Sequence, residues 1–194
     1  MSVRVIAGVA KGRRLGVPEV AGLRPTSDRA RETLFNVLAP SLPGARFLDL
    51  FAGSGAVGIE ALSRGAVAAV FIEQDARAVA TLEANLELCR FAGHGTVVRG
   101  GWRDALRRLA GAEEPFDVAF LDPPYDWPDA HTCLEAILDH ALIAPHGIAV
   151  LEHRDKQAPQ TATSWELFRR VYVGDTAFSF FGVAEGAETD DSTG

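Results

Sequence analysis

The sequence predicts an α/β protein built on a mostly parallel β-sheet. From Phe47 onward, short apolar runs that suit buried strands alternate with longer runs whose apolar residues recur at helical spacing. Strands that alternate with helices form βαβ units, which build a parallel sheet with helices on both faces. Near the end of the chain, Gly174 and Asp175 join two strand-like runs, so we expect an antiparallel finish.

The individual elements can be placed along the chain. Residues 3–17 alternate loosely around a centre rich in glycine and lysine, as a β-hairpin does. A helix is expected to start near Ser27 and to end before Pro40. Further strands are expected at 47–51, 67–72, 96–100, 116–122, 147–153, 167–173 and 177–183, and further helices at 57–64, 76–91, 104–110 and 130–142.

Length and composition fit one globular domain with a small extension. The 194 residues are 47% hydrophobic and 23% charged, which excludes a wholly disordered chain, a collagen and a coiled coil. No apolar run reaches the ~18 residues needed to cross a bilayer, and the N-terminus lacks the pattern of a signal peptide. Two cysteines and five histidines show no disulfide framework and no ligand spacing. We therefore expect a soluble cytoplasmic protein without a metal site.

Charge is distributed unevenly along the chain. The net charge is −7, yet residues 1–46 contain eight Lys and Arg against three Asp and Glu, so the remainder carries −12. A basic segment on an acidic body suits binding to a polyanion, although a solvated charged arm would have the same composition. We predict a basic N-terminal arm (1–43), a main domain (44–183) and a disordered acidic tail (184–194).

A glycine-rich loop follows the first strand of the predicted sheet. Residues 53–58 read Gly-Ser-Gly-Ala-Val-Gly, which matches G-x-G-x-x-G between a strand and a helix. Glycines there allow a tight turn and a close approach of the backbone to a ligand. Glu73, at the end of the next strand, can bind two vicinal ribose hydroxyls. The pattern indicates a nucleoside-type cofactor, and taken alone it also fits a dinucleotide-binding fold.

Asp49 distinguishes between these cofactors. It lies four residues before Gly53, where a carboxylate suits a ligand with an amino group or a sulfonium and would repel a pyrophosphate. The order Asp-Leu-Phe-Ala-Gly-Ser-Gly resembles motif I of the S-adenosylmethionine (SAM)-dependent methyltransferases. The resemblance implies their Rossmann-like class I fold with a seven-stranded sheet, and S-adenosylhomocysteine (SAH) as the product. The implied cofactor contacts are Asp49, Phe51, Gly53, Ser54, Gly55, Glu73, Gln74, Asp104 and Asp122.

Among these residues Asp104 has two expected roles. It follows the third strand of the predicted sheet, where this superfamily reads the adenine amine of the cofactor. An Asp in that position is equally suited to cap the N-terminus of the next helix. Both roles are compatible with the sequence.

A second motif, Asp122-Pro123-Pro124-Tyr125, follows the fourth strand at its carboxyl end, where ligands of open α/β sheets bind. The exocyclic amine of a purine is a poor nucleophile because its lone pair is delocalised into the ring. Hydrogen bonds from the amine to the Asp122 carboxylate and the Pro123 carbonyl would favour a pyramidal nitrogen, and the prolines hold that carbonyl rigidly. Tyr125 can stack on a splayed-out base. We therefore assign these four residues to catalysis of amino methylation.

The N-terminal arm resembles that of a particular family. The segments 4–8, 12–15 and 23–36, with 171–176 near the end, are similar to the RsmD family of bacterial 16S rRNA guanine-N2 methyltransferases. The resemblance runs from about residue 3 to 183 and implies methyl transfer from SAM to the N2 amine of one guanine in the small ribosomal subunit. We expect a monomer. The residues expected to contact this RNA are Arg4, Lys11, Arg13, Arg14, Arg24, Thr26, Arg29, Arg31 and Trp127.

Other functions remain compatible with the sequence. An amino-methyltransferase for DNA adenine or protein glutamine would use the same two motifs, although a DNA enzyme normally needs a separate sequence-reading domain. The short connections of the predicted core leave no room for such a domain. A nucleotide-dependent oxidoreductase would use the glycine loop alone, and a binding-only RNA module would need neither motif intact.

Overall fold

A computed structural model of the chain describes residues 3–19, 26–111, 114–124, 130–154 and 164–184. Its helices are α1 (Asp28–Leu38), the 3-10 turn η1 (Ala39–Ser41), α2 (Ala56–Ser63), α3 (Ala76–Cys89), α4 (Trp102–Leu109) and α5 (Ala130–Asp139). Its strands are β1 (Val3–Arg4), β2 (Arg14–Leu15), β3 (Arg46–Leu50), β4 (Ala68–Glu73), β5 (Gly95–Arg99), β6 (Phe116–Leu121), β7 (Ile143–Arg154), β8 (Trp165–Val173) and β9 (Thr176–Val183).

Within the described residues, seven strands form one sheet in the order β5-β4-β3-β6-β7-β9-β8. The strands from β5 to β7 in this order pair in parallel, whereas β9 runs antiparallel to both β7 and β8. Gly174 adopts a φ of 62° in the tight turn between β8 and β9, a conformation that glycine adopts without steric cost. The predicted mostly parallel sheet with an antiparallel C-terminal strand is confirmed.

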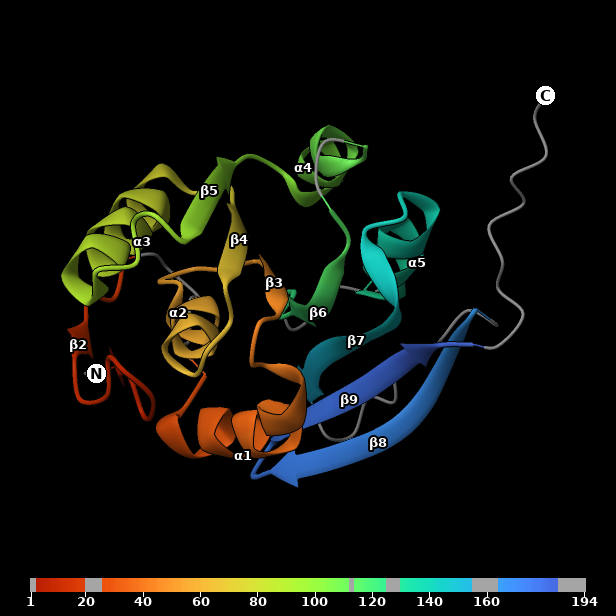
Figure 1. Cartoon of the computed structure of the whole chain (residues 1–194), viewed down its shortest axis with the longest axis horizontal. Helices are drawn as coiled ribbons and strands as arrows, with labels where there is room; N and C mark the ends of the chain where they lie inside the picture. Colours follow the sequence, from red (N-terminus) through yellow and green to blue (C-terminus); the bar gives the residue numbers. More distant parts are fainter. Residues whose placement is uncertain (1–2, 20–25, 112–113, 125–129, 155–163, 185–194) are drawn as a thin grey trace.

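Helices cover both faces of this sheet, with α1, α2 and α3 on one face and α4 and α5 on the other (Figure 1). Residues of the central strands alternate between the two cores that result. Phe71 and Phe120 pack in the core beneath α1, α2 and α3, whereas Ile72 and Leu121 pack in the core beneath α4 and α5. Because side chains alternate along a strand, the residues that directly follow Ile72 and Leu121 at the carboxyl edge point to the face of α1, α2 and α3.

The N-terminal hairpin is fixed to the helices of the main sheet. β1 and β2 pair antiparallel, which confirms the predicted hairpin and limits its strands to two residues each. The backbone amides of Ile6 and Ala7 donate hydrogen bonds of 2.7 and 3.0 Å to the buried carboxylate of Glu60 in α2. The amide of Gly16 donates to Oδ1 of the buried Asn85 in α3 at 2.7 Å. Buried polar side chains therefore anchor the hairpin backbone against the domain.

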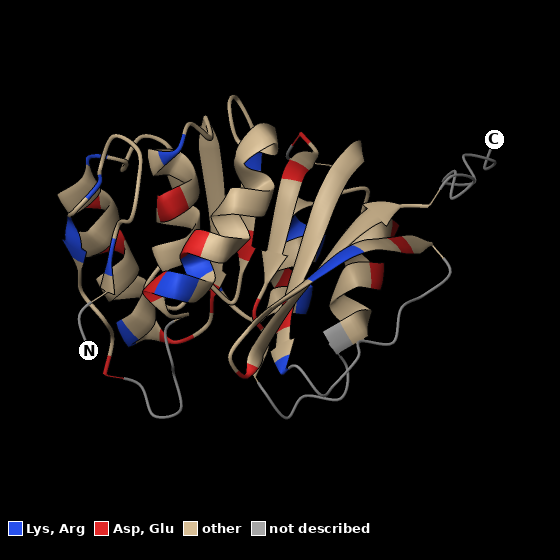
Figure 2. Ribbon diagram, turned by 90° about the horizontal axis from the view of Figure 1, so that it is seen from below, with Lys and Arg blue, Asp and Glu red and all other residues tan. Residues whose placement is uncertain are grey.

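The helix α1 follows the expected local rules. Ser27 is its N-cap, since the Ser27 hydroxyl accepts a hydrogen bond from the amide of Ala30 at 3.2 Å. Leu34 and Phe35 are fully buried in the same core as α2 and α3. Seen from below, basic and acidic positions lie next to each other on α1 (Figure 2). The helix ends at Leu38 and continues as the turn η1, which contains Pro40.

The start predicted for the helix after β5 is wrong. α4 begins at Trp102 with Gly101 as its N-cap, so Asp104 lies within the first turn and cannot cap the helix. The physical reason is packing: Trp102, Ala105, Leu106 and Leu109 recur at helical spacing and face the same core. The carboxylate of Asp104 is exposed and forms an ion pair with Arg107, one turn further along α4.

Four expectations from composition can be compared with the fold. Cys89 and Cys133 are both buried and form no disulfide, as expected for apolar core thiols. In the described part of the chain, no helix is long and apolar enough to span a membrane. Among the same residues, no group of three or more His, Cys, Asp or Glu side chains could hold a metal ion. Of the predicted tail, only Ala184 lies within the described residues.

Candidate active site

The glycine loop joins β3 to α2 through a run of left-handed backbone. Phe51, Gly53 and Gly55 have φ values of 76°, 55° and 75°. Gly55 is the N-cap of α2, and a Cβ added there would lie 2.1 Å from Cδ1 of Leu82 in α3. The positive φ favours glycine at this position, and a Cβ there would also require the side chain of Leu82 to shift. Left-handed φ at a non-glycine residue, as at Phe51, is uncommon and is concentrated at functional sites.

Glu73 holds the glycine loop in place. Its Oε2 accepts a hydrogen bond of 2.9 Å from the amide of Gly53, and its Oε1 accepts from the amides of Gln74 and Asp75 at 2.7 and 2.9 Å. The carboxylate thus joins the end of β4 to the first glycine of the loop beside it. Three backbone donors fix its orientation at the carboxyl edge, where ligands of open α/β sheets bind.

Asp49 lies beneath the loop and is almost fully buried, with 2% of its surface exposed. Its Oδ2 accepts a hydrogen bond of 2.9 Å from the amide of Gly58 in α2. Burial raises the pKa of this carboxyl to about 7, and the nearby negative charge of Glu73 adds to the rise while the Gly58 amide opposes it. Asp49 would therefore be stabilised by a positive charge in front of it.

Four carboxylates from adjacent strands meet on one face of the sheet at its carboxyl edge: Asp49, Glu73, Asp122 and Glu152. The last paired row before this edge consists of Leu50, Ile72, Leu121 and Leu151, all in the core beneath α4 and α5. Residues one step before or after that row point to the opposite face, beneath α1, α2 and α3. Strand register therefore gathers the four acidic side chains into a carboxylate cluster at the carboxyl edge of the sheet.

Asp122 is half-buried and follows β6 directly, with Pro123 buried and Pro124 exposed behind it. Burial raises the pKa of the Asp122 carboxyl well above its usual value, and the negative charges of Glu152 and Asp49 raise it further. Asp122 thus lies where the sequence predicts it, at the carboxyl edge next to the glycine loop. Tyr125 and Trp127, also predicted to act here, lie outside the described residues.

Glu152 is a site residue that the sequence analysis missed. It lies in β7, is 3% exposed, and its Oε2 accepts a hydrogen bond of 2.9 Å from the hydroxyl of Thr26. Burial raises the pKa of Glu152 to about 7, and the Thr26 hydrogen bond opposes this rise. Thr26 directly precedes the N-cap of α1, so the N-terminal segment reaches the site, and Thr26 faces Glu152 there.

The charge of the carboxylate cluster fits a cationic ligand. Among the described residues, no Lys or Arg forms an ion pair with Asp49, Asp122 or Glu152. Each of these carboxyls instead has a pKa raised by burial. A ligand that brings an amino group or a sulfonium would supply the missing positive charge, whereas a pyrophosphate would add to the repulsion.

The basic residues expected to contact RNA differ in exposure. Lys11, Arg14 and Arg29 are exposed. Arg4 is also exposed, and its Nε donates a hydrogen bond of 3.0 Å to Asp28. Arg13 is half-buried and donates from Nη1 to the carbonyl of Leu88 at 2.5 Å. Arg24 lies outside the described residues.

The RNA contact expected for Arg31 is wrong. Its side chain is fully buried, and its Nη2 donates hydrogen bonds of 2.8 and 2.7 Å to the carbonyl of Arg4 and the carboxylate of Asp28. Its Nη1 lies 3.8 Å from the buried carboxylate of Glu60, which also pairs with Arg64. Arg31 therefore neutralises a buried acid between α1, the hairpin and α2, and it is shielded from any phosphate.

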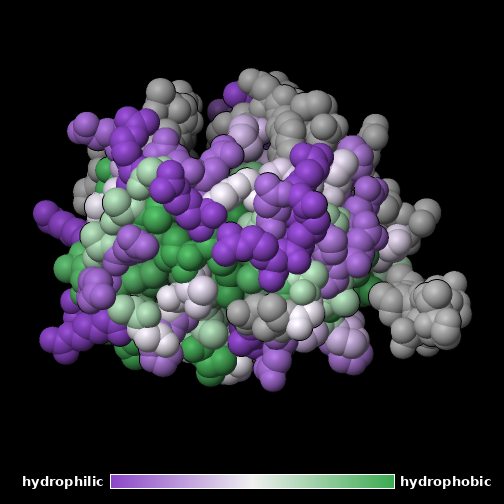
Figure 3. Space-filling model, turned by 90° about the horizontal axis from the view of Figure 1, so that it is seen from above, coloured by the Kyte–Doolittle hydropathy of each residue, from purple (hydrophilic) through white to green (hydrophobic). Residues whose placement is uncertain are grey.

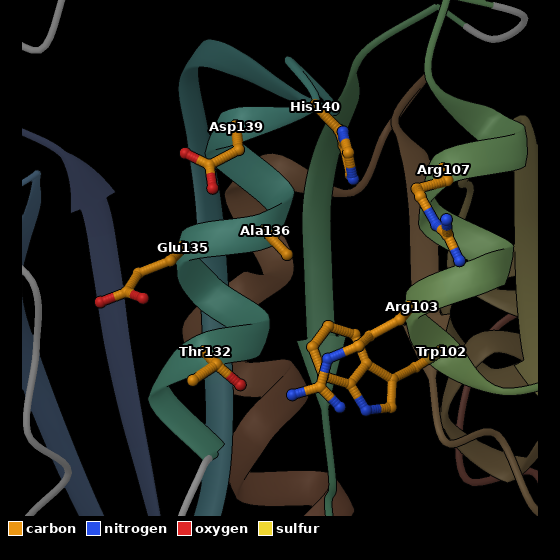
Figure 4. Close-up of a pocket in the computed structure, with 8 residues that line it drawn as sticks. All are labelled: Trp102, Arg103, Arg107, Thr132, Glu135, Ala136, Asp139 and His140. Carbon is orange, nitrogen blue, oxygen red and sulfur yellow. The ribbon is translucent and has the colours of Figure 1, made fainter.

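A hollow of about 330 Å³ lies between α4 and α5, on the other face of the sheet from the carboxylates (Figure 4). Arg103 extends from α4 over the ring of Trp102, with its guanidinium 4.2 Å from the ring centroid. Acidic and basic side chains line the hollow together, and hydrophilic side chains gather over α4 and α5 on this face (Figure 3). The carboxylate cluster, with the glycine loop and Asp122, is therefore separate from this hollow.

Comparison with known proteins identifies the family of the chain. A family model described as Conserved hypothetical protein 95 matches residues 3–182. The Escherichia coli (strain K12) protein named Ribosomal RNA small subunit methyltransferase D is 37% identical over 189 residues, which cover 97% of this chain and 93% of that protein. The chain belongs to the RsmD family.

Solved structures extend the comparison to the fold. A hypothetical protein of Thermus thermophilus aligns with this RsmD family member at a TM-score of 0.80 and 36% identity, covering 93% of this chain and 99% of that chain. SMU.776, crystallised in complex with SAH, aligns at a TM-score of 0.68 with 16% identity and covers 84% of this chain and 50% of that one. At that identity SMU.776 shares the fold alone. The expected family and fold class are thus confirmed.

Proposed function

We propose that this chain transfers the methyl group of SAM to the exocyclic N2 amine of a guanine in the 16S rRNA of the small ribosomal subunit. Family membership supports the reaction and the class of substrate, because the Escherichia coli relative is named a ribosomal RNA small subunit methyltransferase. The observation that carries the proposal is the position of Asp122 and Pro123 at the same sheet edge as the glycine loop and Glu73.

The residues of the carboxylate cluster and the glycine loop fit SAM. Asp49 and the glycine loop would hold the amino acid end of the cofactor. Glu73 would bind a ribose hydroxyl with the lone pair of Oε2 that its three backbone donors leave free. Phe51, Ser54 and Gln74 adjoin these groups in the chain. Bound SAM supplies an electrophilic methyl group on a sulfonium and leaves as SAH.

The residues after β6 would act on the amine. The Asp122 carboxylate and the Pro123 carbonyl accept hydrogen bonds from its two N–H groups, which turns the nitrogen lone pair towards the methyl group. Asp122 then accepts the proton that the methylated nitrogen releases, a task for which its raised pKa suits it. Pro123 and Pro124 fix the backbone between them, so little reorganisation is needed at the moment of reaction.

The exposed basic residues of the N-terminal segment support an RNA substrate. Lys11, Arg14 and Arg29 are exposed on the hairpin and on α1, and Arg4 lies beside them on β1. Phosphate contacts of this kind position a nucleic acid and carry no sequence information. Asp104 stays a proposed contact to the adenine of the cofactor. A monomer and a cytoplasmic location complete the proposal.

The substrate class can be tested by competition. Transfer of labelled methyl groups from SAM would be measured with small ribosomal subunits that lack the modification, with naked 16S rRNA, with adenine-containing duplex DNA and with a glutamine-containing protein. The proposal predicts label in the subunits or the rRNA, and inhibition by unlabelled rRNA alone. Label in DNA or in protein would instead identify an amino-methyltransferase that acts on DNA adenine or on protein glutamine. Binding of NAD(P)H in place of SAM would identify an oxidoreductase.

A further inference from the structure

We propose that Glu152 recognises the N1–H group of the target guanine, next to the N2 amine held by Asp122, and thereby selects guanine over bases whose N1 accepts hydrogen bonds. The inference rests on the proposed function and names a specificity-determining residue within the same site. Thr26 is assigned as the positioning residue that orients Glu152.

The placement of Glu152 follows from strand register. β6 and β7 are parallel neighbours, and Leu121 pairs with Leu151 (Figure 1). Glu152 is the next residue of β7 and Asp122 directly follows β6, so the two lie side by side at the carboxyl edge of the sheet. Neighbouring strands are about 4.8 Å apart. The charge of Glu152 raises the pKa of Asp122, which agrees with two carboxyls in close proximity.

Guanine presents two kinds of donor on one edge in a matching arrangement. Its N2 amine and its N1–H group are adjacent on the Watson–Crick edge and point the same way. Two carboxylates side by side can accept from both donors at once, Asp122 from the amine and Glu152 from N1–H. Adenine and 2-aminopurine carry an unprotonated N1 that would place a lone pair against the Glu152 carboxylate.

The environment of Glu152 makes such a mismatch costly. The residue is 3% exposed, so water cannot replace a missing hydrogen bond to its carboxylate when a base fills the site. Thr26 donates to Oε2, and no described residue donates a hydrogen bond to Oε1. Oε1 is therefore the oxygen that could accept a hydrogen bond from an N1–H group. The positive charge of a sulfonium bound near the carboxylate cluster would favour the ionised form of Glu152, which is the form that accepts a hydrogen bond from N1–H.

Thr26 sets the direction of the carboxylate. Its hydroxyl holds Oε2 at 2.9 Å from the segment before α1, and this leaves Oε1 as the oxygen available to a ligand. Loss of the hydroxyl would free the side chain to rotate without removing its charge. The N-terminal segment would in this way contribute to base selection as well as to phosphate binding.

The test compares guanine with 2-aminopurine at the target position, once product analysis has mapped that position. 2-Aminopurine keeps the reactive amine and replaces N1–H by an acceptor. Small-subunit RNA carrying either base would be prepared by ligation and methylated by the wild-type protein, by Glu152→Gln and by Thr26→Val. Because the N1 acceptor of 2-aminopurine leaves the buried carboxylate unmatched, we expect wild-type kcat/KM to be about 100-fold lower for 2-aminopurine than for guanine.

In Glu152→Gln, the ratio of kcat/KM for guanine to kcat/KM for 2-aminopurine should fall to less than about 10-fold, since the amide of Gln can donate to the N1 acceptor. Thr26→Val should narrow it by a smaller factor. Matched controls are Glu166→Gln, an exposed carboxylate on β8, and Thr33→Val, whose hydroxyl donates to the carbonyl of Arg29 within α1. Both controls should keep the wild-type ratio. SAM affinity, measured by calorimetry, should change by less than about threefold in Thr26→Val, since that change leaves every charge of the site in place.

The failures of the two proposals can be told apart. If the wild-type protein forms N2-methylguanosine but Glu152→Gln and Thr26→Val keep its base ratio, Glu152 does not recognise N1–H. If Glu152→Gln fails to fold, the ratio of Thr26→Val decides the matter alone. If the wild-type protein methylates no guanine in unmodified RNA, the proposed function itself is overturned, and this inference with it.

Discussion

The hydroxyl of Thr26 donates a hydrogen bond of 2.9 Å to the carboxylate of Glu152, across 126 positions of sequence. This contact joins the N-terminal segment, with its basic residues, to the carboxyl edge of the central sheet. The edge also holds Asp122, Glu73 and the glycine loop. Elements that would bind phosphate and elements that would perform the chemistry are thus parts of one folded unit.

Asp122→Ala is expected to reduce methyl transfer by about 10²–10³-fold while SAM affinity stays within a few-fold of wild type, since removal of one preorganised group at a reacting centre has effects of this size. Transfer of label to subunits and calorimetric titration with SAM measure the two quantities. Asp139→Ala, at an exposed position on α5, is the control. A large loss of SAM affinity in Asp122→Ala would reassign Asp122 to the cofactor.

Glu73→Ala is expected to weaken SAM binding by about 10- to 100-fold, because the ribose loses its acceptor and the loop loses the carboxylate that orients it. Glu73 accepts from the amides of Gly53, Gln74 and Asp75, so a modest drop in thermal stability should accompany this loss. Calorimetry and thermal unfolding provide the readouts. Glu83→Ala, exposed on α3, should change neither. Unchanged SAM affinity in Glu73→Ala would refute the ribose role.

Asp49→Asn is expected to stabilise the ligand-free protein at neutral pH and to weaken SAM binding. Burial raises the pKa of Asp49 to about 7, whereas an unfolded Asp titrates near ~4. The folded state therefore binds the proton more tightly, and the free energy of unfolding falls as pH rises between these values and levels off above them. The advantage of Asp49→Asn should grow over the same window.

Thermal unfolding at pH 5 and pH 7.5 checks this prediction for Asp49. Each kcal/mol corresponds to about 2–4 °C in a chain of this size, so the difference in Tm between variant and wild type should reach several degrees at pH 7.5. Asp139→Asn should show no such pH-dependent difference, because Asp139 is exposed. Equal Tm values for Asp49→Asn and wild type at pH 7.5 would contradict the assigned burial of a charge.

Replacing Arg13 and Arg14 by Ala is expected to weaken RNA binding and to reduce its salt dependence. For every phosphate that the variant no longer neutralises, the slope of log K against log salt should fall by about 0.7–0.9. Filter binding of 16S rRNA across a range of salt concentrations measures the slope. Arg77→Ala, exposed on α3 and paired with Asp75, serves as the control. An unchanged slope in the double variant would show that these two residues do not touch phosphate.

Local patterns predicted much of the fold and the site. The alternation of strands and helices, the N-cap at Ser27 and the glycine loop all depend on residues close together in the chain. Asp49, Glu73 and Asp122 could be predicted because each stands at a fixed offset from the end of a strand, and parallel strands bring such offsets to one edge.

Long-range packing explains what the sequence could not predict. Arg31 lies three and four residues before Leu34 and Phe35, so helical spacing places it on the buried face of α1 and is a signal that could have found it. What the sequence could not show is its partner, because Glu60 in α2 is remote in the chain. Glu152 was missed because its partner Thr26 is remote in the chain. Alternation along β7 does place Glu152 on the face of Val150 and one step beyond Leu151, which is a signal that could have found it.

The identity of the methylated nucleoside reports on the substrate and on the catalytic residue in one experiment. Small ribosomal subunits that lack the modification would be incubated with the protein and labelled SAM, and their 16S rRNA digested to nucleosides for chromatography and mass spectrometry. We expect the label in N2-methylguanosine, and about 10²–10³-fold slower labelling with Asp122→Ala. Label in N6-methyladenosine, or equal label with Asp122→Ala, would contradict the assignment of substrate and catalytic residue.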